Sequence, residues 1–278
     1  MNDNFQNYER ERVLILASYA TSLKNFRGPL ILEISSRGHE VHVVAPNLSS
    51  HFALVDWLQA NGVTCHDVLL SRAGISPLDD MRTFFALVRI FRRVRPSVLL
   101  SYTIKPVIWG TLSAWLAGVP RRFALITGLG YAFTGQAKGK RAAIKLAARW
   151  FYAKALHRAS LVFFQNPDDE FEFRRLNLIS EGLLSIVVNG SGVDTKAFSV
   201  TQIPTGPPRF LLIARLLGDK GIREFAAAAE KIRSLNPKIE FHLVGDHDQN
   251  PDSIQLNEIR SWEAAGHIVW HGELEDVR

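Results

Sequence analysis

The sequence is almost free of cysteine, since Cys65 is the single one in 278 residues. A lone cysteine excludes a disulfide framework and fits a reducing compartment. No apolar run approaches the ~20 residues needed to span a bilayer. The polar start MNDNFQNYERER lacks the apolar core of a signal peptide. We therefore expect a cytoplasmic protein.

Several motifs of common enzyme classes are also missing. The nine histidines show no metal-ligand spacing, so we expect no metal and no other cofactor. The absence of G-x-G-x-x-G and G-x-S-x-G argues against a dinucleotide-binding dehydrogenase and an α/β-hydrolase. A G-x-G occurs at Gly128 and Gly130 without the third glycine. This weak signal indicates a loop that lets a ligand approach the backbone.

Charge is unevenly distributed along the chain. The net charge is +6, but residues 1–189 hold 23 basic and 14 acidic residues, against 10 and 13 in residues 190–278. Such asymmetry indicates two segments with different roles, the first facing an anionic partner. Nucleic acid, a membrane surface and a phosphorylated substrate all satisfy this condition.

Apolar runs of strand length alternate with segments of helical period. Most runs are continuous and rich in Val, Ile, Leu and Phe, which is typical of strands buried on both faces of a parallel sheet. Repeated strand–helix–strand units predict a doubly wound α/β fold. The first strands are expected at 13–18, 40–46, 63–70, 97–103, 122–128, 160–166 and 184–190, with helices at 25–37, 52–61, 77–94, 106–117, 138–158 and 167–177.

Residues 199–208, with three prolines and a glycine, interrupt this rhythm. They predict a linker between a domain at 1–198 and a second domain at 209–278. The second domain has expected strands at 209–215, 239–246 and 267–273, with helices between them. That is roughly half of a nucleotide-binding α/β domain, so we expect the second domain to be incomplete.

The loop after strand 209–215 places Arg215 and Lys220 between a strand and a helix that begins near Gly221. Free N–H groups and the dipole at a helix N-terminus already favour an anion. An arginine fork and a lysine point charge together suit a diphosphate. The alternative is a basic loop in solvent without a role.

Two loops of the first domain carry further polar side chains at the carboxyl ends of strands. Asn25, Arg27 and Gly28 follow the first strand, and Asn25 is expected to cap the next helix. Tyr102 and Lys105 end strand 97–103. Lys105 would anchor a phosphate or polarise a leaving group, unless it is only a surface lysine.

The segment 138–159 is basic and interleaved with aromatic residues. Amphipathic helices of this kind bind anionic membrane surfaces. The alternative is an ordinary helix that packs on the sheet with its cations in solvent. Nucleic acid is not expected, since no nucleic-acid motif accompanies the charges. The expected membrane contacts are Lys138, Lys140, Arg141, Lys145, Arg149 and Trp150.

Six segments together resemble the family-four glycosyltransferases, which are retaining enzymes of the two-domain GT-B fold. The closest likeness is to the bacterial branch that builds capsular, O-antigen or lipid-linked oligosaccharides. The matching stretches are SYATSLKNFRGPLI (18–31), SYTIKPVIWG (101–110), ITGLGYAF (126–133), VFFQNPDDEFEF (162–173), NGSGVDTKAF (189–198) and IARLLGDKG (213–221).

The resemblance implies two Rossmann-like domains and assigns roles to residues. Arg215 and Lys220 would hold the diphosphate of a UDP-sugar and stabilise charge on the departing UDP without a metal. Gly28 and Gly245 are assigned to the donor site, and Asn189, Gly192 and Asp194 to structural roles between the domains. The acceptor-side candidates are Asn25, Arg27, Tyr102, Lys105, Gly128 and Gly130.

Two departures from the family pattern matter. Many relatives have a histidine at the end of the fourth strand, where this chain has Tyr102 to Lys105. The family's glutamate pair and closing helix would lie beyond Arg278. We therefore expect turnover of the chain as given to be at least ~10²-fold below that of a longer version.

The sequence thus predicts a retaining glycosyltransferase. It would move a hexose or N-acetylhexosamine from a UDP-sugar to a lipid-linked saccharide in cell-surface polysaccharide biosynthesis. It would act as a peripheral protein at the cytoplasmic face of the plasma membrane. Two alternatives stay open: a nucleotide-sugar epimerase of the same fold, and a non-catalytic protein that docks on membranes or a partner transferase.

Overall fold

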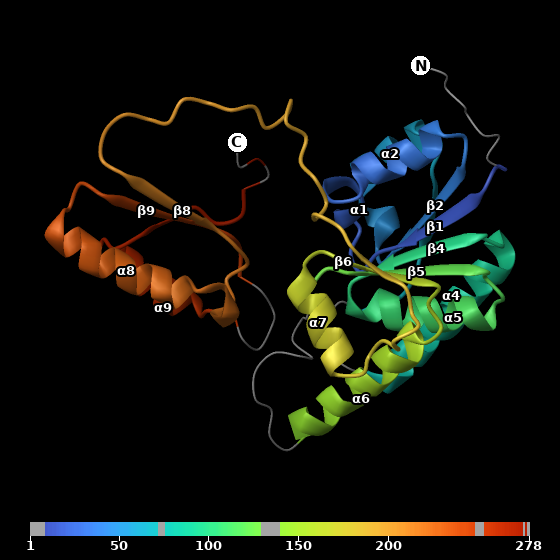
Figure 1. Ribbon diagram of the computed structural model, residues 1–278. Coiled ribbons are helices and arrows are strands. Elements are labelled where there is room, and N and C mark those ends of the chain that lie inside the picture. The colour runs from blue at the N-terminus through green and yellow to red at the C-terminus, as the bar shows by residue number, and fades with distance from the viewer. Residues whose placement is uncertain (1–8, 72–75, 129–139, 248–252, 275, 277–278) are drawn as a thin grey trace. The chain divides into compact units, whose positions relative to one another are not determined.

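The computed structural model describes residues 9–71, 76–128, 140–247, 253–274 and 276, with the helical backbone alone for 140–145. The chain divides into two compact units, Met1–Gly192 and Val193–Arg278. By this division, residues 199–208 belong to the second unit. Each unit has its own parallel sheet (Figure 1).

The sheet of the first unit is built as the apolar runs predict. Its strands are β1 (Arg12–Leu16), β2 (Glu40–Ala45), β3 (Thr64–Asp67), β4 (Val98–Tyr102), β5 (Arg121–Ile126), β6 (Leu161–Phe164) and β7 (Ser185–Val187). All pair in parallel, in the order β3-β2-β1-β4-β5-β6-β7. The chain therefore winds outward from β1 in one direction, and then returns to begin β4 on its other side.

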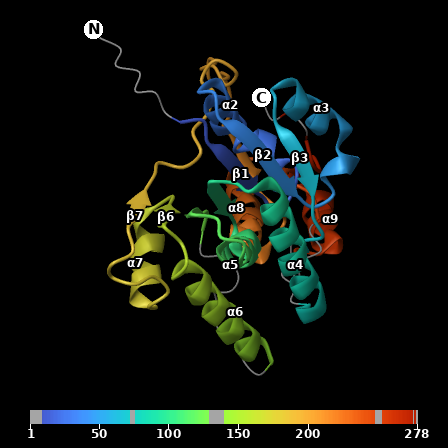
Figure 2. The ribbon, with the colours of Figure 1, turned by 90° about the vertical axis from the view of Figure 1, so that its right-hand side faces the viewer.

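Helices cover both faces of this sheet (Figures 1 and 2). They are α1 (Ser22–Asn25), α2 (Gly28–Ser36), α3 (Phe52–Ala60), α4 (Pro77–Val94), α5 (Thr111–Leu116), α6 (Lys140–Leu156) and α7 (Pro167–Arg175), with short turns η1 (Leu48–Ser50) and η2 (Pro106–Gly110). Side chains of α1, α2 and α3 share one core with Val13 and Ile15 of β1. Leu14 and Leu16 point to the other face, into a core with α4 and α5.

The sequence of α4 explains where the helix begins and how its two ends are stabilised. Pro77 is its first residue, where a missing N–H costs nothing. Asp79 and Asp80 occupy the first turn, while Arg92 and Arg93 occupy the last, so both ends complement the helix dipole.

Two helices differ from the prediction. The segment 25–37 is split, since α1 ends at Asn25 and α2 begins at Gly28. Asn25 therefore does not cap α2, whose N-cap is Arg27 without a side-chain hydrogen bond. The segment 106–117 opens as a π-helical turn, η2. There, a Cβ on Gly110 would lie 2.5 Å from a methyl group of Leu16, so glycine permits the close approach to β1.

The second unit repeats the first pattern on a smaller scale. Its strands are β8 (Arg209–Ile213), β9 (Glu240–Val244) and β10 (Val269–Trp270), in the order β10-β9-β8. Its helices are η3 (Gly218–Lys220), α8 (Ile222–Leu235) and α9 (Leu256–Ala264). Leu216, Ile222, Phe241, Leu243 and Ile259 form its core. The order matches that of β3-β2-β1, so each unit winds the same way from its first strand.

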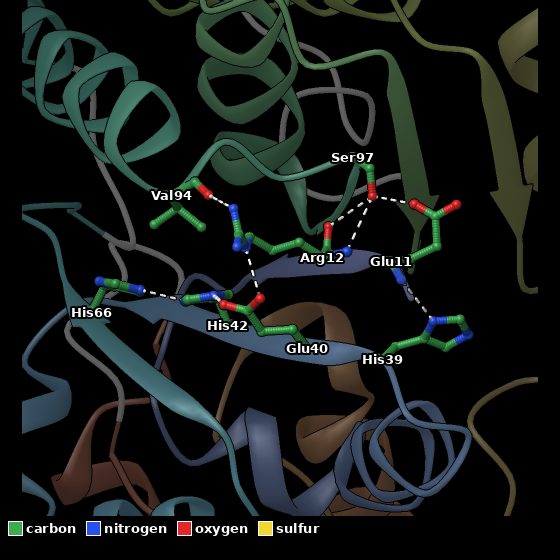
Figure 3. Close-up of polar contacts among 8 residues, drawn as sticks. All are labelled: Glu11, Arg12, His39, Glu40, His42, His66, Val94 and Ser97. Carbon is green, nitrogen blue, oxygen red and sulfur yellow. Dashed lines mark hydrogen bonds and ion pairs between the residues drawn. The ribbon is translucent and has the colours of Figure 1, made fainter. Parts of the chain in front are cut away.

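A polar cluster joins the first three strands of the first unit (Figure 3). The Arg12 guanidinium of β1 pairs with Glu40 of β2 at 2.9 Å. His42 Nε2 donates to Glu40 at 2.8 Å, and His66 of β3 lies 2.9 Å from His42 Nδ1. Since the carboxylate can only accept, His42 carries its proton on Nε2, and His66 Nε2–H donates to Nδ1. The two rings stack at 5.2 Å.

The same set of four residues, an Arg, a Glu and two His, recurs in the second unit at matching register. Arg209 of β8 pairs with Glu240 of β9 at 3.0 Å, and His242 donates to Glu240 at 3.2 Å. His271 lies 2.9 Å from His242, and their rings stack at 5.2 Å. Arg12 faces Glu40 in the ladder as Arg209 faces Glu240. The first three strands of both units thus share one polar scaffold, and two pairs of similar runs accompany it: RVLILA (12–17) with RFLLIA (209–214), and EVHVV (40–44) with EFHLV (240–244).

Gly245, expected in the donor site, has a packing role at the end of β9. Its φ is +150°, and a Cβ there would lie 1.9 Å from the carbonyl oxygen of Ala214. Its own carbonyl accepts a hydrogen bond from the Trp270 indole at 2.9 Å. Only glycine therefore allows β9 to pass the end of β8.

The histidine cluster predicts loss of stability in acid. Burial lowers the pKa of His66 from 6.5 to about 4, and His42 and Arg93 oppose its charge further. Because the folded-state pKa is depressed, this stability is present above pH ~6.5 and is lost as pH falls toward ~4. His66 is half-exposed, so we expect a loss of about 1 kcal/mol by about pH 5 after solvent screening.

Urea unfolding at neutral and acid pH checks this expectation. His66→Gln keeps an N–H donor toward His42 and should reduce the acid loss. His51→Gln removes an exposed histidine and should leave it unchanged. An identical pH dependence in wild type and His66→Gln would contradict the assignment.

Gly245→Ala should destabilise the second unit by about 2 to 4 kcal/mol, because its methyl group meets backbone that cannot move freely. Gly266→Ala is the matched control, with φ +69° and no atom within 4 Å of the added Cβ. It should cost about 1 kcal/mol, from backbone conformation alone. Equal losses in the two variants, measured by urea unfolding, would show that the close approach is not the constraint.

Candidate functional site

The reversal of strand order places two loops of the first unit together. β1 pairs with both β2 and β4, so the loops that follow β1 and β4 leave the same edge of the sheet as neighbours. Open α/β sheets bind ligands at this switch point. Ser18, Ser22 and Arg27 from the first loop are buried there, as is Tyr102 at the end of β4.

Arg27 is the central side chain of this edge. It is only 5% exposed, and its guanidinium lies 4.7 Å from the centroid of the Tyr102 ring. Its Nη1 donates to the Phe26 carbonyl at 2.9 Å and to the Ser191 hydroxyl at 2.7 Å. Its Nε is buried without a hydrogen-bond partner.

No carboxylate of the described residues pairs with Arg27, and burial lowers its pKa from the ordinary value. A buried ion without a counter-ion costs several kcal/mol. The cation–π contact with Tyr102 returns only about 2 kcal/mol even when desolvated. This contact and the two hydrogen bonds of Nη1 all come from neutral groups, so the guanidinium lacks a counter-ion among the described residues.

Tyr102 cannot supply that charge. Burial raises its pKa to about 12, so the phenol stays protonated at neutral pH. Its hydroxyl lies 2.7 Å from the Ser22 hydroxyl, and both are buried. Tyr102 and Ser22 thus form a neutral, rigid wall beside the guanidinium.

Thr103, the next residue, is a functional candidate that the sequence did not reveal. Its φ is +68°, which a β-branched residue adopts only under strain. Its hydroxyl is buried and has no hydrogen-bond partner among the described residues. No sequence motif indicates that a threonine adopts this conformation. Thr103 is identified as a candidate only from its backbone angle in the structure.

The segment after β7 reaches the same place. Ser191 is exposed and accepts hydrogen bonds from Arg27 and, at 3.3 Å, from Gln165 after β6. Gly190 and Gly192 on either side have φ of +72° and +74°. The glycine-flanked serine, whose neighbours were assigned only structural roles, thus lies against the candidate site. Asp194 does have a structural contact, since it accepts from the Lys196 backbone at 2.9 Å.

Lys105 is already neutralised. Its ammonium lies 2.9 Å from Asp80 in the first turn of α4, and both side chains are largely buried. It is therefore neither a free phosphate anchor nor an idle surface lysine in this structure. The pair ties η2 to α4.

The remaining acceptor-side and donor-side glycines of the first unit stay predictions. Gly28 is the buried first residue of α2, beside Trp57 at an ordinary contact distance. Gly128 has φ +142° and open space around it. Asn25 is exposed. Gly130 and Lys138 lie outside the described residues.

The loop after β8 occupies, within the second unit, the place that the Arg27 loop occupies in the first. Arg215 is exposed, and the Lys220 side chain is 44% exposed and 3.6 Å from Asp219. Gly221, with φ +73°, caps the start of α8. Lys220 thus directly precedes the residue that caps α8, and the assignment of Arg215 and Lys220 to a diphosphate stays a prediction.

Other charged groups pair among themselves. A hollow of about 500 Å³ at the amino ends of β1, β2 and β4 is lined by Arg10, Glu11, Arg12, Glu40, Arg95 and Ser97. Arg12 and Glu11 are in ion pairs there, and Arg10 and Arg95 are exposed to solvent, so none of these arginines is a buried charge like Arg27. The described part of the chain contains no group of three His, Cys, Asp or Glu residues able to hold a metal.

Helix α6 exposes part of its apolar side. Leu146 and Trp150 are exposed, and the Lys154 ammonium lies 5.6 Å from the Trp150 ring. Arg149 is half-buried, and the side chains of Lys140, Arg141 and Lys145 lie outside the described ones. In the described ranges, no helix combines the length and apolar character needed to cross a bilayer.

Comparison with known proteins extends this description. One relative, from Campylobacter jejuni, is N,N'-diacetylbacillosaminyl-diphospho-undecaprenol alpha-1,3-N-acetylgalactosaminyltransferase, 27% identical over 96% of this chain and 70% of its own length. Another, from Escherichia coli, is UDP-Gal:alpha-D-GlcNAc-diphosphoundecaprenol alpha-1,3-galactosyltransferase, 26% identical over 62% of this chain and 46% of its own length.

A glycosyltransferase structure from Rickettsia africae superposes with a TM-score of 0.62 at 15% identity, covering 97% of this chain and 70% of that one. The likeness confirms the expected GT-B-type α/β architecture with a smaller second sheet. The family model of glycosyl transferase 4-like proteins matches residues 12–166, which include β1 to β6 and the Arg27 edge. The chain therefore belongs to the glycosyl transferase 4-like family.

Proposed function

We propose that this protein transfers a hexose or N-acetylhexosamine from a UDP-sugar to a lipid-linked saccharide, with retention of configuration. One observation carries the proposal: both curated relatives are named for transfer to a sugar on diphospho-undecaprenol. The basic first unit suits such an acceptor, since it holds most of the chain's excess positive charge.

The donor's diphosphate would bind to the loop after β8. In the transfer, the bond between the sugar and the UDP oxygen breaks, and the acceptor oxygen bonds to the sugar carbon. The acceptor's proton passes to the departing phosphate. Negative charge grows on UDP, and the cations Arg215 and Lys220 would stabilise it together with the start of α8. No metal is required for this step.

Lys220→Ala and Arg215→Ala should each weaken UDP binding by about tenfold or more, since each removes a charge-assisted contact. Turnover should fall with affinity, because the same cations meet the charge of the leaving group. Isothermal calorimetry with UDP and transfer assays with a UDP-sugar measure both effects.

Lys231→Ala is the matched control, because it removes an exposed lysine from the same unit on α8. It should leave UDP affinity and turnover unchanged. If Arg215→Ala and Lys220→Ala both bind UDP with wild-type affinity, the donor site does not lie in this loop.

An acceptor requirement separates this proposal from the two alternatives. An epimerase would convert free UDP-sugar without an acceptor. A docking protein would neither transfer nor hydrolyse the donor. The family match favours transfer.

We further place the protein at the cytoplasmic membrane surface, through α4 and α6. The exposed residues Leu78, Met81 and Phe85 line α4, and Leu146 and Trp150 line α6. Aromatic contacts link the two helices, from Phe85 through Phe84, Trp109 and Phe151 to Trp150, with successive centroid distances of 5.4, 6.5, 5.1 and 4.9 Å. Exposed Arg89 and Lys154 supply positive charge beside these apolar groups.

Leu146→Ser and Trp150→Ser should therefore reduce binding to vesicles rich in phosphatidylglycerol by about fivefold or more, because each removes apolar area that enters the bilayer interface. Co-sedimentation measures the bound fraction. Leu235→Ser, at an equally exposed leucine of α8, should have no effect. Binding that survives both α6 substitutions would contradict this orientation.

A further inference from the structure

We propose that the Arg27 edge of the first unit is a phosphate-binding site, in which the free edge of the Arg27 guanidinium and the Thr103 hydroxyl take a phosphate group of the acceptor's diphosphate. Naming the acceptor as the source rests on the proposed function. The anion site itself rests on the described residues alone.

The free edge of the guanidinium has the geometry that a phosphate requires. Nη1 is held by the Phe26 carbonyl and Ser191. Nε is buried without a partner, and the hydrogen bonds of Arg27 to the described residues come from Nη1. In an arginine, the N–H bonds of Nε and Nη2 point the same way as a parallel pair. This fork matches two oxygens of a phosphate.

The scaffold around the fork is pre-organised. Burial to 5% exposure and the ring of Tyr102 fix the plane of the guanidinium. Tyr102 is itself held by Ser22. A ligand therefore meets a cation that has already lost its water and its rotational freedom, so less entropy is lost on binding.

Thr103 supplies an independent observation. Its hydroxyl is buried without a partner, and it directly follows the Tyr102 ring on which Arg27 stacks. Its φ of +68° holds a β-branched residue in a conformation that glycine would adopt without strain. A strained threonine with an unused hydroxyl, directly after the tyrosine that contacts a guanidinium without a counter-ion, supports a site built for a ligand with oxygens.

Ser191 contacts the guanidinium from the protein surface. It is exposed, while the guanidinium that it touches is buried. The Ser191 hydroxyl thus contacts Nη1 as a neutral acceptor at the protein surface, and it supplies no negative charge to the guanidinium.

Two substrates of the proposed reaction carry a diphosphate, the donor and the acceptor. The donor's diphosphate is assigned to Arg215 and Lys220 in the second unit. The first unit has its own cation, and it belongs to the basic part of the chain. We therefore assign the Arg27 site to the acceptor, and the experiment distinguishes the two sources.

Ser191→Asp is the sharpest variant, because it offers Arg27 the carboxylate that it lacks. It should raise Tm by about 2 to 4 °C, by pairing the buried charge. It should also lower the affinity for inorganic pyrophosphate by about tenfold or more, because the new carboxylate neutralises the guanidinium from the Nη1 side. A purely structural arginine would gain the stability without any change in pyrophosphate binding.

Arg27→Met and Thr103→Gly test the two groups themselves. Arg27→Met removes the buried charge and should keep or raise Tm, while pyrophosphate affinity falls by about tenfold or more. Thr103→Gly relieves the strained φ and should raise Tm, yet weaken pyrophosphate binding by about threefold or more. Arg37→Met removes an exposed arginine just after α2 and is the matched control for both measurements.

Pyrophosphate binding is measured by calorimetry on the full chain, and KM for a diphosphate-linked acceptor and for the UDP-sugar is measured separately. We expect Ser191→Asp to raise the acceptor KM and to leave the UDP-sugar KM unchanged. A raised KM for the UDP-sugar alone would assign the site to the donor and overturn the acceptor assignment. Pyrophosphate affinity equal to wild type in Ser191→Asp and Thr103→Gly would overturn the site, even where Arg27→Met does not fold.

The two proposals fail in different ways. If pyrophosphate binding depends on Arg27 but no sugar is transferred, the anion site is supported and the proposed transferase activity is refuted. If sugar is transferred and Ser191→Asp does not change the acceptor KM, the transferase activity is supported and the acceptor role of the Arg27 site is refuted.

Discussion

The position of β1 between β2 and β4 is the constraint on which the first unit depends. β1 is paired along both edges and its four residues after Arg12 are buried, so its register is fixed by both neighbours and both cores. Because β4 returns beside β1, the ends of these strands bring Arg27 next to Tyr102 although 75 positions separate them in the sequence. The candidate site exists because of this one crossover.

Hydrophobic pattern and cap residues predicted most of the fold. The continuous apolar runs gave the parallel strands, and Pro77 with its following aspartates gave α4. The split at Phe26 and the π turn of η2 were missed, because both arise from tertiary contacts. In η2, the backbone turns where Gly110 must pass Leu16. Periodicity carries no information about such an approach.

The candidate site was predictable only in part. Arg27 and Tyr102 were identified as site candidates because they follow strands. Their contact and the missing counter-ion were not predicted, since the burial of a charge depends on residues that are distant in the sequence. The sequence indicated Lys105 as a phosphate anchor, but in the structure its ammonium pairs with Asp80. The paired Arg–Glu–His–His clusters were missed as well. Their strands have similar runs, EVHVV (40–44) and EFHLV (240–244), but the contacts between strands follow only from the register.

Those clusters make the two units comparable strand by strand. If β1-β2-β3 corresponds to β8-β9-β10, the loop with Arg27 corresponds to the loop with Arg215 and Lys220. The cations differ in environment, since Arg27 is buried and Lys220 is half-exposed. In the proposed reaction, this difference fits the separate roles of the two diphosphate sites. A buried, fixed fork suits a diphosphate whose charge does not change, whereas a solvated lysine can follow charge as it grows on UDP and then release the product into water.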